Sequence, residues 1–372
     1  MPQTPDPDSS TRPTQQDVAR AAGVSLATVD RVFNLRSNVR TDTARRVAEA
    51  ARRIGYHASG VIERHVRADR PRHRFGFLLL REGAAFYGGL AEALVQAAAN
   101  FGEADVVTRI ERLDNLEPGH AARALLALGA QVDALAVVAA DHVQVHAAVA
   151  TLRSRGVPVV ALISDLAAPA RAGYVGLDNR KTGRTAAWFI TRMARRPGPL
   201  ALCLGSNRFQ CQELCEMSFR SYVRELGGEW EVLAPRMTLE NEGYAYETTL
   251  DLLQAQPELC GLYLAGGGAL GVLQALRAFR ERGLPTPVSI CHDLTPVTRQ
   301  ALQEGILHAV LSHPVPEMAR ATIELLAQAL RDPMEGPDPA ATGFGVGVHA
   351  DLLTQRLVQR WVPLQVDTPE NL

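Results

Sequence analysis

The pattern of apolar and polar positions divides the chain into two parts with different periods. Between residues 14 and 56, three short amphipathic segments follow one another at helical spacing, with too little sequence between them for strands. From residue 75 onward, short apolar runs alternate with amphipathic helical segments. Such alternation predicts βαβ units and a parallel sheet covered by helices on both faces. We therefore expect a small all-helical head followed by a larger α/β domain.

The alternation runs twice through the α/β part. The first half contains the apolar runs FGFLLL, ADVVTRI, ALAVVA and PVVALIS, with helices expected over 88–101, 118–129 and 142–155. The second half contains LALCLG, GLYLAG and VSIC and a weaker strand near 230–234, with helices expected over 212–226, 242–254 and 269–282. Two doubly wound parallel sheets predict a two-lobed domain with a ligand cleft at the carboxyl ends of the strands.

The charge distribution changes the picture at the N-terminus. The 372-residue chain has a net charge of −1, yet residues 12–72 carry thirteen arginines against six acidic residues. The hydrophobic fraction of 47% and the charged fraction of 21% are those of an ordinary globular protein. Because arginine neutralises phosphate, a basic head on an acidic body predicts a polyanionic partner for the head alone.

Cysteine usage and the first residues favour a cytoplasmic protein. The five cysteines form no CxxC pair, so they are expected to be reduced thiols. Residues 1–13 lack the apolar core of a signal peptide and are expected to be a disordered leader, and no long uninterrupted apolar stretch follows. His142 and His146 lie one helical turn apart, but no third ligand is evident, so neither a metal site nor any cofactor is expected.

The segment TQQDVARAAGVSLATVDRVFN, residues 14–34, carries the signals of a helix-turn-helix. Thr14 and Asp17 fit a capping box, Gly23 suits the tight turn, and Ser25 can cap a second helix. The second helix of such a motif enters the major groove of DNA. The alternative is a three-helix bundle with solvated arginines, but the turn glycine, both caps and the basic charge all agree with DNA binding.

Together with NVRTDTARRVAEAARRIGY, this segment resembles the DNA-binding head of the lactose repressor (LacI-type) family. The resemblance implies base contacts from Leu26, Ala27 and Arg31, and phosphate contacts from Thr28 and Asn34. Arginine can also pair with guanine through two hydrogen bonds. Asp30 departs from the family, which often has a small hydroxyl there; it could accept from a cytosine amine or restrain Arg31. The DNA-binding residues expected are Thr14, Ser25, Leu26, Ala27, Thr28, Asp30, Arg31, Asn34 and Val66.

The linker over 58–73 also departs from the family. Relatives have a Pro-Asn pair where this chain has Ala58 and Ser59, and an intercalating Leu where it has His65 or Val66. Apolar wedges bend DNA by opening a base step from the minor groove. Val66 is a shorter wedge than Leu, so the sequence leaves hinge intercalation open.

Residues 173–186, GYVGLDNRKTGRTA, resemble the family's crossover between the two lobes. The resemblance implies effector contacts from Asp178, Asn179 and Arg180, whose side chains suit vicinal hydroxyls. The alternative for Asp178 is a helix N-cap. Within SICHDLTP, Asp293 falls where relatives place an aspartate that accepts from sugar hydroxyls. Aromatic contacts are expected from Phe86, Tyr87 and Tyr244.

Two positions of the expected cleft differ from the family. Cys215 stands where an arginine commonly reaches the effector, and Gly266 stands where an acid is usual. The loss of one charge of each sign implies a sugar- or polyol-like effector other than the common galactosides. The glycine run at 266–268 lacks the Lys and Ser/Thr of a phosphate-binding loop, so we expect a tight turn there.

The resulting hypothesis is a homodimeric or tetrameric regulator, a repressor, whose operator affinity an effector modulates. Dimers are expected because one recognition helix reads few base pairs. The alternatives are a periplasmic solute-binding protein, which would need a signal peptide, and a Rossmann-type enzyme, which would need a glycine fingerprint where this chain reads REGAAFYGG; we expect no enzyme. The expected domains are the leader 1–13, the helix-turn-helix domain 14–57, the linker 58–73, the N-terminal lobe 74–177 plus about 309–340, and the C-terminal lobe 178–308 plus about 341–372.

Overall fold

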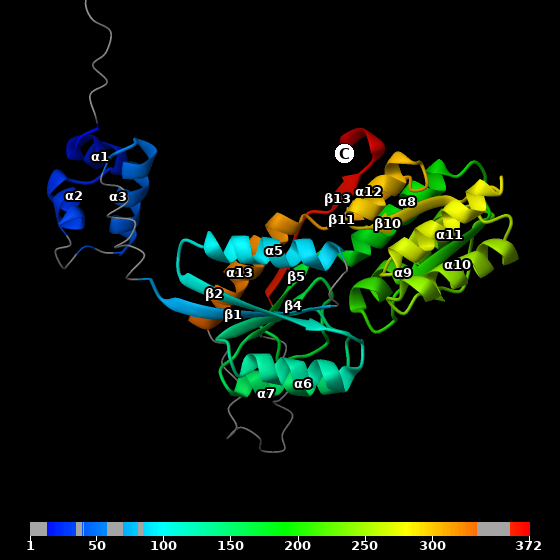
Figure 1. Cartoon of the computed structure of the whole chain (residues 1–372), viewed down its shortest axis with the longest axis horizontal. Coiled ribbons are helices and arrows are strands. Elements are labelled where there is room, and N and C mark those ends of the chain that lie inside the picture. Colours follow the sequence, from blue (N-terminus) through cyan, green and yellow to red (C-terminus); the bar gives the residue numbers. More distant parts are fainter. Residues whose placement is uncertain (1–12, 35–38, 40, 58–69, 81–84, 333–357) are drawn as a thin grey trace, which may run out of the picture. The chain divides into compact units, whose positions relative to one another are not determined.

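The computed structural model describes residues 13–34, 39, 41–57, 70–80, 85–332 and 358–372 (Figure 1). Contacts divide the chain into two compact units, Met1–His73 with Phe101–Asp105, and the remainder. The helical head belongs to the first unit, and nearly all of the α/β sensor domain forms the second. Residues 1–12 of the expected leader over 1–13 and the hinge position Val66 lie outside the described residues.

Three helices form the head, α1 (Gln15–Ala22), α2 (Leu26–Phe33) and α3 (Thr41–Arg53). The predicted caps are confirmed: Thr14 and Asp17 make a capping box on α1, and the Ser25 side chain accepts from the Thr28 amide at the start of α2. Gly23 has φ 64°, the left-handed conformation that only glycine adopts without strain. A small apolar core then joins the helices, with its fully buried members being Val18, Val29, Val47 and Ala51.

The first lobe of the sensor domain is built on a six-stranded sheet in the order β12-β5-β4-β3-β1-β2. Its strands are β1 (Arg72–Leu80), β2 (Asp105–Leu113), β3 (Ala134–Val137), β4 (Val159–Leu162), β5 (Gly173–Gly176) and β12 (Val358–Trp361). Helices α6 (Pro118–Gly129) and α7 (Val143–Ser154) cover one face, and α5 (Ala85–Ala99) and α13 (Val315–Arg331) cover the other (Figure 1). Strands β3 and β4 are buried throughout, as the continuous apolar runs predict.

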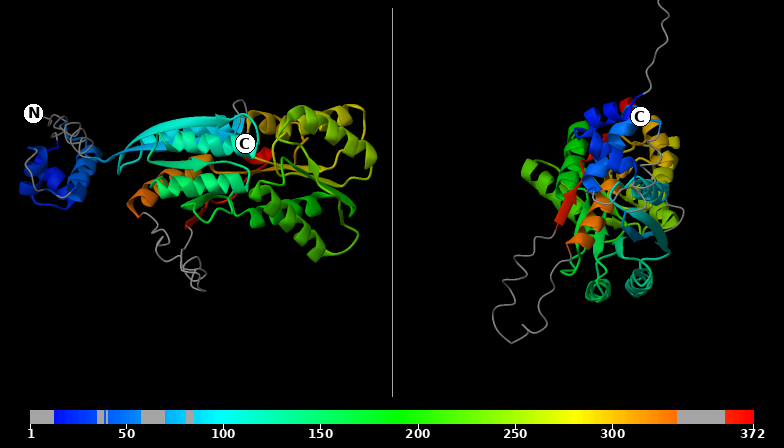
Figure 2. Two further views of the ribbon diagram at one scale, coloured as in Figure 1. Left: turned by 90° about the horizontal axis from the view of Figure 1, so that it is seen from below. Right: turned by 90° about the vertical axis from the view of Figure 1, so that its left-hand side faces the viewer.

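The second lobe has a seven-stranded sheet in the order β13-β11-β10-β9-β6-β7, with β8 also paired to β6. Its strands are β6 (Pro199–Leu204), β7 (Glu231–Val232), β8 (Arg236–Met237), β9 (Gly261–Leu264), β10 (Val288–His292), β11 (Ala309–Ser312) and β13 (Gln365–Asp367). One apolar cluster lies under α8 (Asn179–Met193) and α9 (Gln210–Leu226). A second lies under α10 (Glu242–Ala255), α11 (Ala269–Glu281) and α12 (Pro296–Gln303), on the opposite face (Figure 2). A short 3-10 helix, Pro369–Asn371, ends the chain.

The boundaries between the lobes differ from those expected. We expected the chain to re-enter the first lobe at about residue 309, but β11 pairs with β10 in the second sheet. We expected the last residues in the second lobe, but β12 pairs with β5 in the first sheet and only β13 returns to the second. The reason is that a short apolar strand fits either sheet equally well, so its period does not reveal its partner. The described chain therefore crosses between the sheets after β5, β11 and β12.

Candidate functional site

The exposed face of α2 carries the residues expected to read DNA. Leu26 is 47% exposed, and Ala27 and Arg31 are also exposed, while Val29 and Val32 point into the core of the head. Thr14 and Ser25 serve as helix caps. The Ser25 hydroxyl also lies 2.8 Å from that of Thr28. The second helix thus exposes an apolar start and a guanidinium in its last turn, and DNA contacts from these residues stay predictions.

Asp30 contacts Asn34 in the structure. The Asn34 Nδ2 donates to Asp30 Oδ1 at 2.6 Å, one helical turn apart, so Asp30 positions one of the expected phosphate contacts. Two arginines of the basic head have structural roles instead. Arg46 donates to the carbonyl of Ala22 at 2.7 Å, and Arg53 donates to that of Ala21 at 3.0 Å, so both satisfy carbonyls at the end of α1.

In the sensor domain, Asp293 lies directly after β10, at the carboxyl end of the second sheet. Its φ of 63° is left-handed, which is uncommon for a residue with a side chain. Asp293 Oδ1 accepts from the backbone amide of His313 at 2.9 Å and lies 2.8 Å from its Nδ1. Burial favours the neutral carboxyl, but His313 favours the carboxylate, and the net effect lowers the pKa of Asp293. The site therefore holds a buried carboxylate.

His313 is a candidate that the sequence analysis missed. It follows β11 at the crossover into the first lobe, and its side chain is 5% exposed. Because Nδ1 faces the carboxylate of Asp293, Nδ1 carries a proton and donates it to that carboxylate, while Nε2 is left for another partner. Among the described residues, Nε2 is buried and has no hydrogen-bond partner. Polar residues at strand ends are the signal that could have identified it.

The first lobe contributes two of the expected aromatic residues, Phe86 and Tyr87, next to His313 and Asp293. Helix α5 carries Phe86, whose ring centroid lies 5.6 Å from that of His313 and 5.2 Å from that of Tyr87. The pKa of Tyr87 is raised well above its ordinary value by burial first, and then by the charges of Glu240 and Asp293 and by Cys211. The structure thus brings together Phe86, Tyr87 and Asp293, which the sequence placed only singly.

The residues of the first crossover serve structural roles in the contacts described. Asp178 is the N-cap of α8, where it accepts from the Lys181 amide at 3.3 Å, so the alternative considered for it is confirmed. Asn179 is buried and donates to the Tyr174 hydroxyl at 3.2 Å. Arg180 is exposed, and Tyr244 is 46% exposed in the first turn of α10. Effector contacts from these four residues stay predictions.

The two lobes touch through backbone groups beside the cleft. The Asp141 amide donates to the Arg208 carbonyl at 2.7 Å, and the Cys211 amide donates to the Ser164 hydroxyl at 3.3 Å. Helix α9 has no side-chain cap from its own N-cap residue, Phe209. A residue of the first lobe therefore satisfies an amide in the first turn of a second-lobe helix.

Neither of the positions that differ from the family offers a charge. Cys215 is buried, its pKa is raised by burial, and its thiol contacts the carbonyl of Asn179 at 3.5 Å. A side chain at Gly266 would collide with the Gly205 amide and with Gln212. No group of histidine, cysteine and acidic residues suited to a metal ion occurs in the part of the chain that the structure describes. Nor is any helix among the described residues long and apolar enough to cross a membrane.

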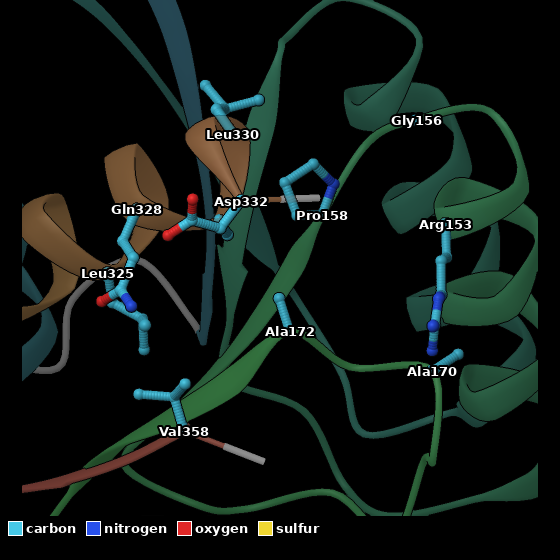
Figure 3. A pocket seen from close by; sticks show the side chains of 11 residues that line it. Arg153, Gly156, Pro158, Ala170, Ala172, Leu325, Gln328, Leu330, Asp332 and Val358 are labelled. Atoms are coloured by element: carbon cyan, nitrogen blue, oxygen red, sulfur yellow. The ribbon is translucent and has the colours of Figure 1, made fainter. Parts of the chain in front are cut away.

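A separate cavity of about 180 Å³ lies at the opposite end of the first sheet (Figure 3). Its lining includes Pro158, Ala172 and Val358, which lie at the amino ends of β4, β5 and β12, with Leu325 and Gln328 of α13. Ligands of open parallel sheets bind at the carboxyl ends of the strands. The surroundings of Asp293 lie at the carboxyl end and are therefore the candidate effector site, and effector contact there stays a prediction.

Comparison with known proteins agrees with this arrangement. Residues 75–333 match the periplasmic binding protein domain, and residues 14–59 match the lacI family of bacterial regulatory proteins. The chain is 24% identical over 365 residues to the HTH-type transcriptional regulator Rv3575c of Mycobacterium tuberculosis, covering 89% of this chain and 99% of that protein.

Among solved structures, the sensor domain is similar to GanP, a glucose-galactose binding protein from Geobacillus stearothermophilus, with a TM-score of 0.65, 20% identity, and coverage of 80% of this chain and 99% of that one. It is also similar to a solute binding protein of Agrobacterium vitis with bound D-fucose, with a TM-score of 0.66, 16% identity, and coverage of 80% and 96%. A DNA-reading head on a two-lobed binding domain has a regulatory and not a transport architecture. Residues 75–333 place the chain in the periplasmic binding protein domain family, and with its lacI-family head the protein is a DNA-binding transcriptional regulator.

Proposed function

We propose that this regulator is a cytoplasmic repressor whose operator affinity is set by a sugar- or polyol-like effector bound beside Asp293. The observation that carries this proposal is the buried Nε2 of His313, which has no hydrogen-bond partner among the described residues. A buried polar group without a partner costs stability, and a ligand hydroxyl would satisfy it. The sugar-binding proteins of similar fold support the same ligand class.

The chemistry of the cleft suits hydroxyl donors. Oδ1 of Asp293 takes both hydrogen bonds from His313, and no described residue donates to Oδ2. A ligand hydroxyl can therefore donate to the carboxylate while a neighbouring hydroxyl, which can donate or accept, hydrogen-bonds to His313 Nε2. Phe86 and Tyr87 add apolar surface against which the C–H face of a sugar ring can pack.

Regulation follows if the effector binds one arrangement of the lobes more tightly than the other. An effector between Tyr87 of the first lobe and Asp293 of the second favours the closed arrangement, and only such differential affinity can shift the equilibrium. We propose a homodimer or a tetramer, in which this shift changes the spacing of two heads on paired half-sites.

The proposal is tested by thermal unfolding of the full chain in the presence of D-galactose, D-fucose, D-allose, D-tagatose and D-arabinose. Stabilisation by at least one of them is expected, and Asp293→Asn should weaken its binding by roughly 10- to 100-fold, the range for hydrogen bonds to charged groups. Asp251→Asn, at an exposed position of α10, is the control. Binding that is unchanged in Asp293→Asn would refute the location of the cleft.

A gel-shift assay tests the DNA function. Fragments selected by the protein from genomic DNA should give a band that survives higher salt than a random fragment does, because base contacts add to phosphate contacts. Release of that band by the effector would support repression by the unliganded form. A protein with equal affinity for both fragments at every salt concentration would contradict operator recognition.

A further inference from the structure

The carboxylate of Glu240 lies in a cradle of glycines at the carboxyl ends of two adjacent strands. Gly205 follows β6, and Gly267 lies just beyond β9. A side chain at Gly205 or at Gly267 would occupy the space that the Glu240 carboxylate fills. These glycines therefore admit an acidic group that arrives from another part of the chain, the loop between β8 and α10.

Gln212 fixes this carboxylate in place. Its Nε2 donates to Glu240 Oε1 at 2.9 Å, while the Gly267 amide donates to the same oxygen at 3.2 Å. The amide oxygen of Gln212 in turn accepts from the amides of Gly205 and Ser206, at 2.7 and 3.0 Å. The buried side chain of Gln212 thus bonds on both sides to this group of loops and orients Glu240.

The backbone also departs from ordinary conformations to bring Glu240 here. Leu239 has φ 54° and Glu240 has φ 53°, so two successive residues with side chains adopt the left-handed region. Such conformations persist where the surrounding structure holds them, and they are concentrated at ligand sites. Leu239 is 58% exposed, so its packing does not account for the turn. The two left-handed residues therefore direct the Glu240 side chain toward Gly205 and Gly267.

Glu240 belongs to the same cleft as Asp293. Strands β6, β9 and β10 are neighbours and run parallel, so Gly205, Gly267 and Asp293 follow adjacent strand ends at one edge of the sheet. Burial is the main cause that raises the pKa of the Cys211 thiol to about 12, and the charges of Glu240 and Asp293 act in the same direction. The same two carboxylates act on Tyr87, which comes from the first lobe. Tyr87 and Cys211 thus lie within reach of both acidic groups, one at the end of β10 and the other beside the ends of β6 and β9.

We infer that Glu240 is the second acidic contact of the effector cleft, so that the cleft takes neutral or cationic polyols and rejects sugar acids. This inference rests on the proposed effector function. An acid cannot stand at Gly266, because its side chain would collide with Gln212 and the Gly205 amide, and Glu240 delivers a carboxylate to the same strand ends. The arginine that could receive an anionic ligand is replaced by the buried Cys215. A second carboxylate beside Asp293 repels a uronate and accepts from a hydroxyl.

The test uses the full chain and pairs each neutral aldose with its uronic acid: D-galactose with D-galacturonate and D-glucose with D-glucuronate. Calorimetry should show that the wild type binds a neutral sugar at least tenfold more tightly than the paired acid. Glu240→Gln keeps an oxygen that can accept from Gln212 and Gly267 but removes the charge. It should weaken binding of the neutral sugar and reduce the ratio of neutral-sugar affinity to uronate affinity at least tenfold. Glu247→Gln, exposed on α10, should change neither.

A second variant separates charge from position. Glu240→Asp keeps the charge but withdraws it from the glycine cradle, so it should lose affinity for the neutral sugar while it still rejects the uronate. A wild type that prefers the uronate, or a Glu240→Gln protein with unchanged affinity and preference while Asp293→Asn loses binding, overturns the inference and leaves the proposed function standing. A wild type that binds none of these sugars, nor those tested above, overturns the proposed function and this inference with it.

Discussion

Acid should destabilise the sensor domain through one partly buried histidine. His292 ends β10, its Nε2 lies 2.5 Å from the hydroxyl of Tyr263, and its pKa is lowered from 6.5 to about 4. Burial is the main cause; the charge of His313 lowers this pKa further, and the charge of Asp293 opposes both. In the unfolded chain the same imidazole takes up a proton near pH 6.5.

The sign and size of the effect follow from linkage. Between pH 6.5 and 4 the unfolded state binds more protons at this residue than the native state, so stability present above pH 6.5 is lost as the pH falls toward 4. At about 1.4 kcal/mol for each pKa unit, His292 alone should lower the free energy of unfolding by about 2 kcal/mol from pH 7 to pH 5.

Tryptophan fluorescence during urea unfolding measures this quantity for the sensor domain alone, because all three tryptophans, Trp188, Trp230 and Trp361, lie outside the head. His292→Gln should reduce the difference between pH 7 and pH 5 by about 2 kcal/mol, whatever its effect on stability at pH 7. His120→Gln, at a half-exposed position of α6, should leave the difference unchanged. If His292→Gln retains the full difference, another group is responsible and the argument from burial is wrong.

Changes at three other places separate the roles of surface and core. Arg31→Ala should weaken specific operator binding by about 1–3 kcal/mol and leave binding to random DNA nearly intact, because a base contact carries the discrimination; equal losses in gel shifts would mean a phosphate contact. Arg171→Met should cost about 3–5 kcal/mol in urea unfolding because it leaves the carboxylate of Asp165 buried without its guanidinium, whereas Arg123→Met, from an exposed pair, should cost less than about 1 kcal/mol. Gly183→Ala should cost about 1–3 kcal/mol, because the added methyl collides with the backbone of α9; an unchanged midpoint would show that α8 and α9 can separate freely.

The head was predictable because its signals are local. The cap at Thr14, the turn at Gly23 and the cap at Ser25 each act within one helical turn, and the structure confirms all three. The alternation of strands and helices likewise revealed two parallel sheets. Strand partners are set by distant contacts, so the sheets to which β11 and β12 belong could not be read from their apolar residues.

The cleft was predictable only in part, for the same reason. Asp293 and the aromatic pair at 86–87 follow strands, where ligands are expected. His313 becomes a candidate only through its contact with Asp293, twenty positions away in the sequence, so no local pattern marks it. Glu240 reaches the cleft through a left-handed turn of residues that do not favour one, so no turn signal marked it. Asp178 caps helix α8 in the structure, and the effector contact that the resemblance implies for it stays a prediction.

The contact between Ser164 and the Cys211 amide makes the start of α9 a reporter of lobe movement. Separation of the lobes leaves this amide without its acceptor, because helix α9 supplies no side-chain cap of its own. Solvent deuterium can then enter at residue 211 each time the cleft opens. The exchange rate of the Cys211 amide thus reports how readily the lobes separate. An effector that holds the lobes together should slow exchange at this amide more than at any other in the helix.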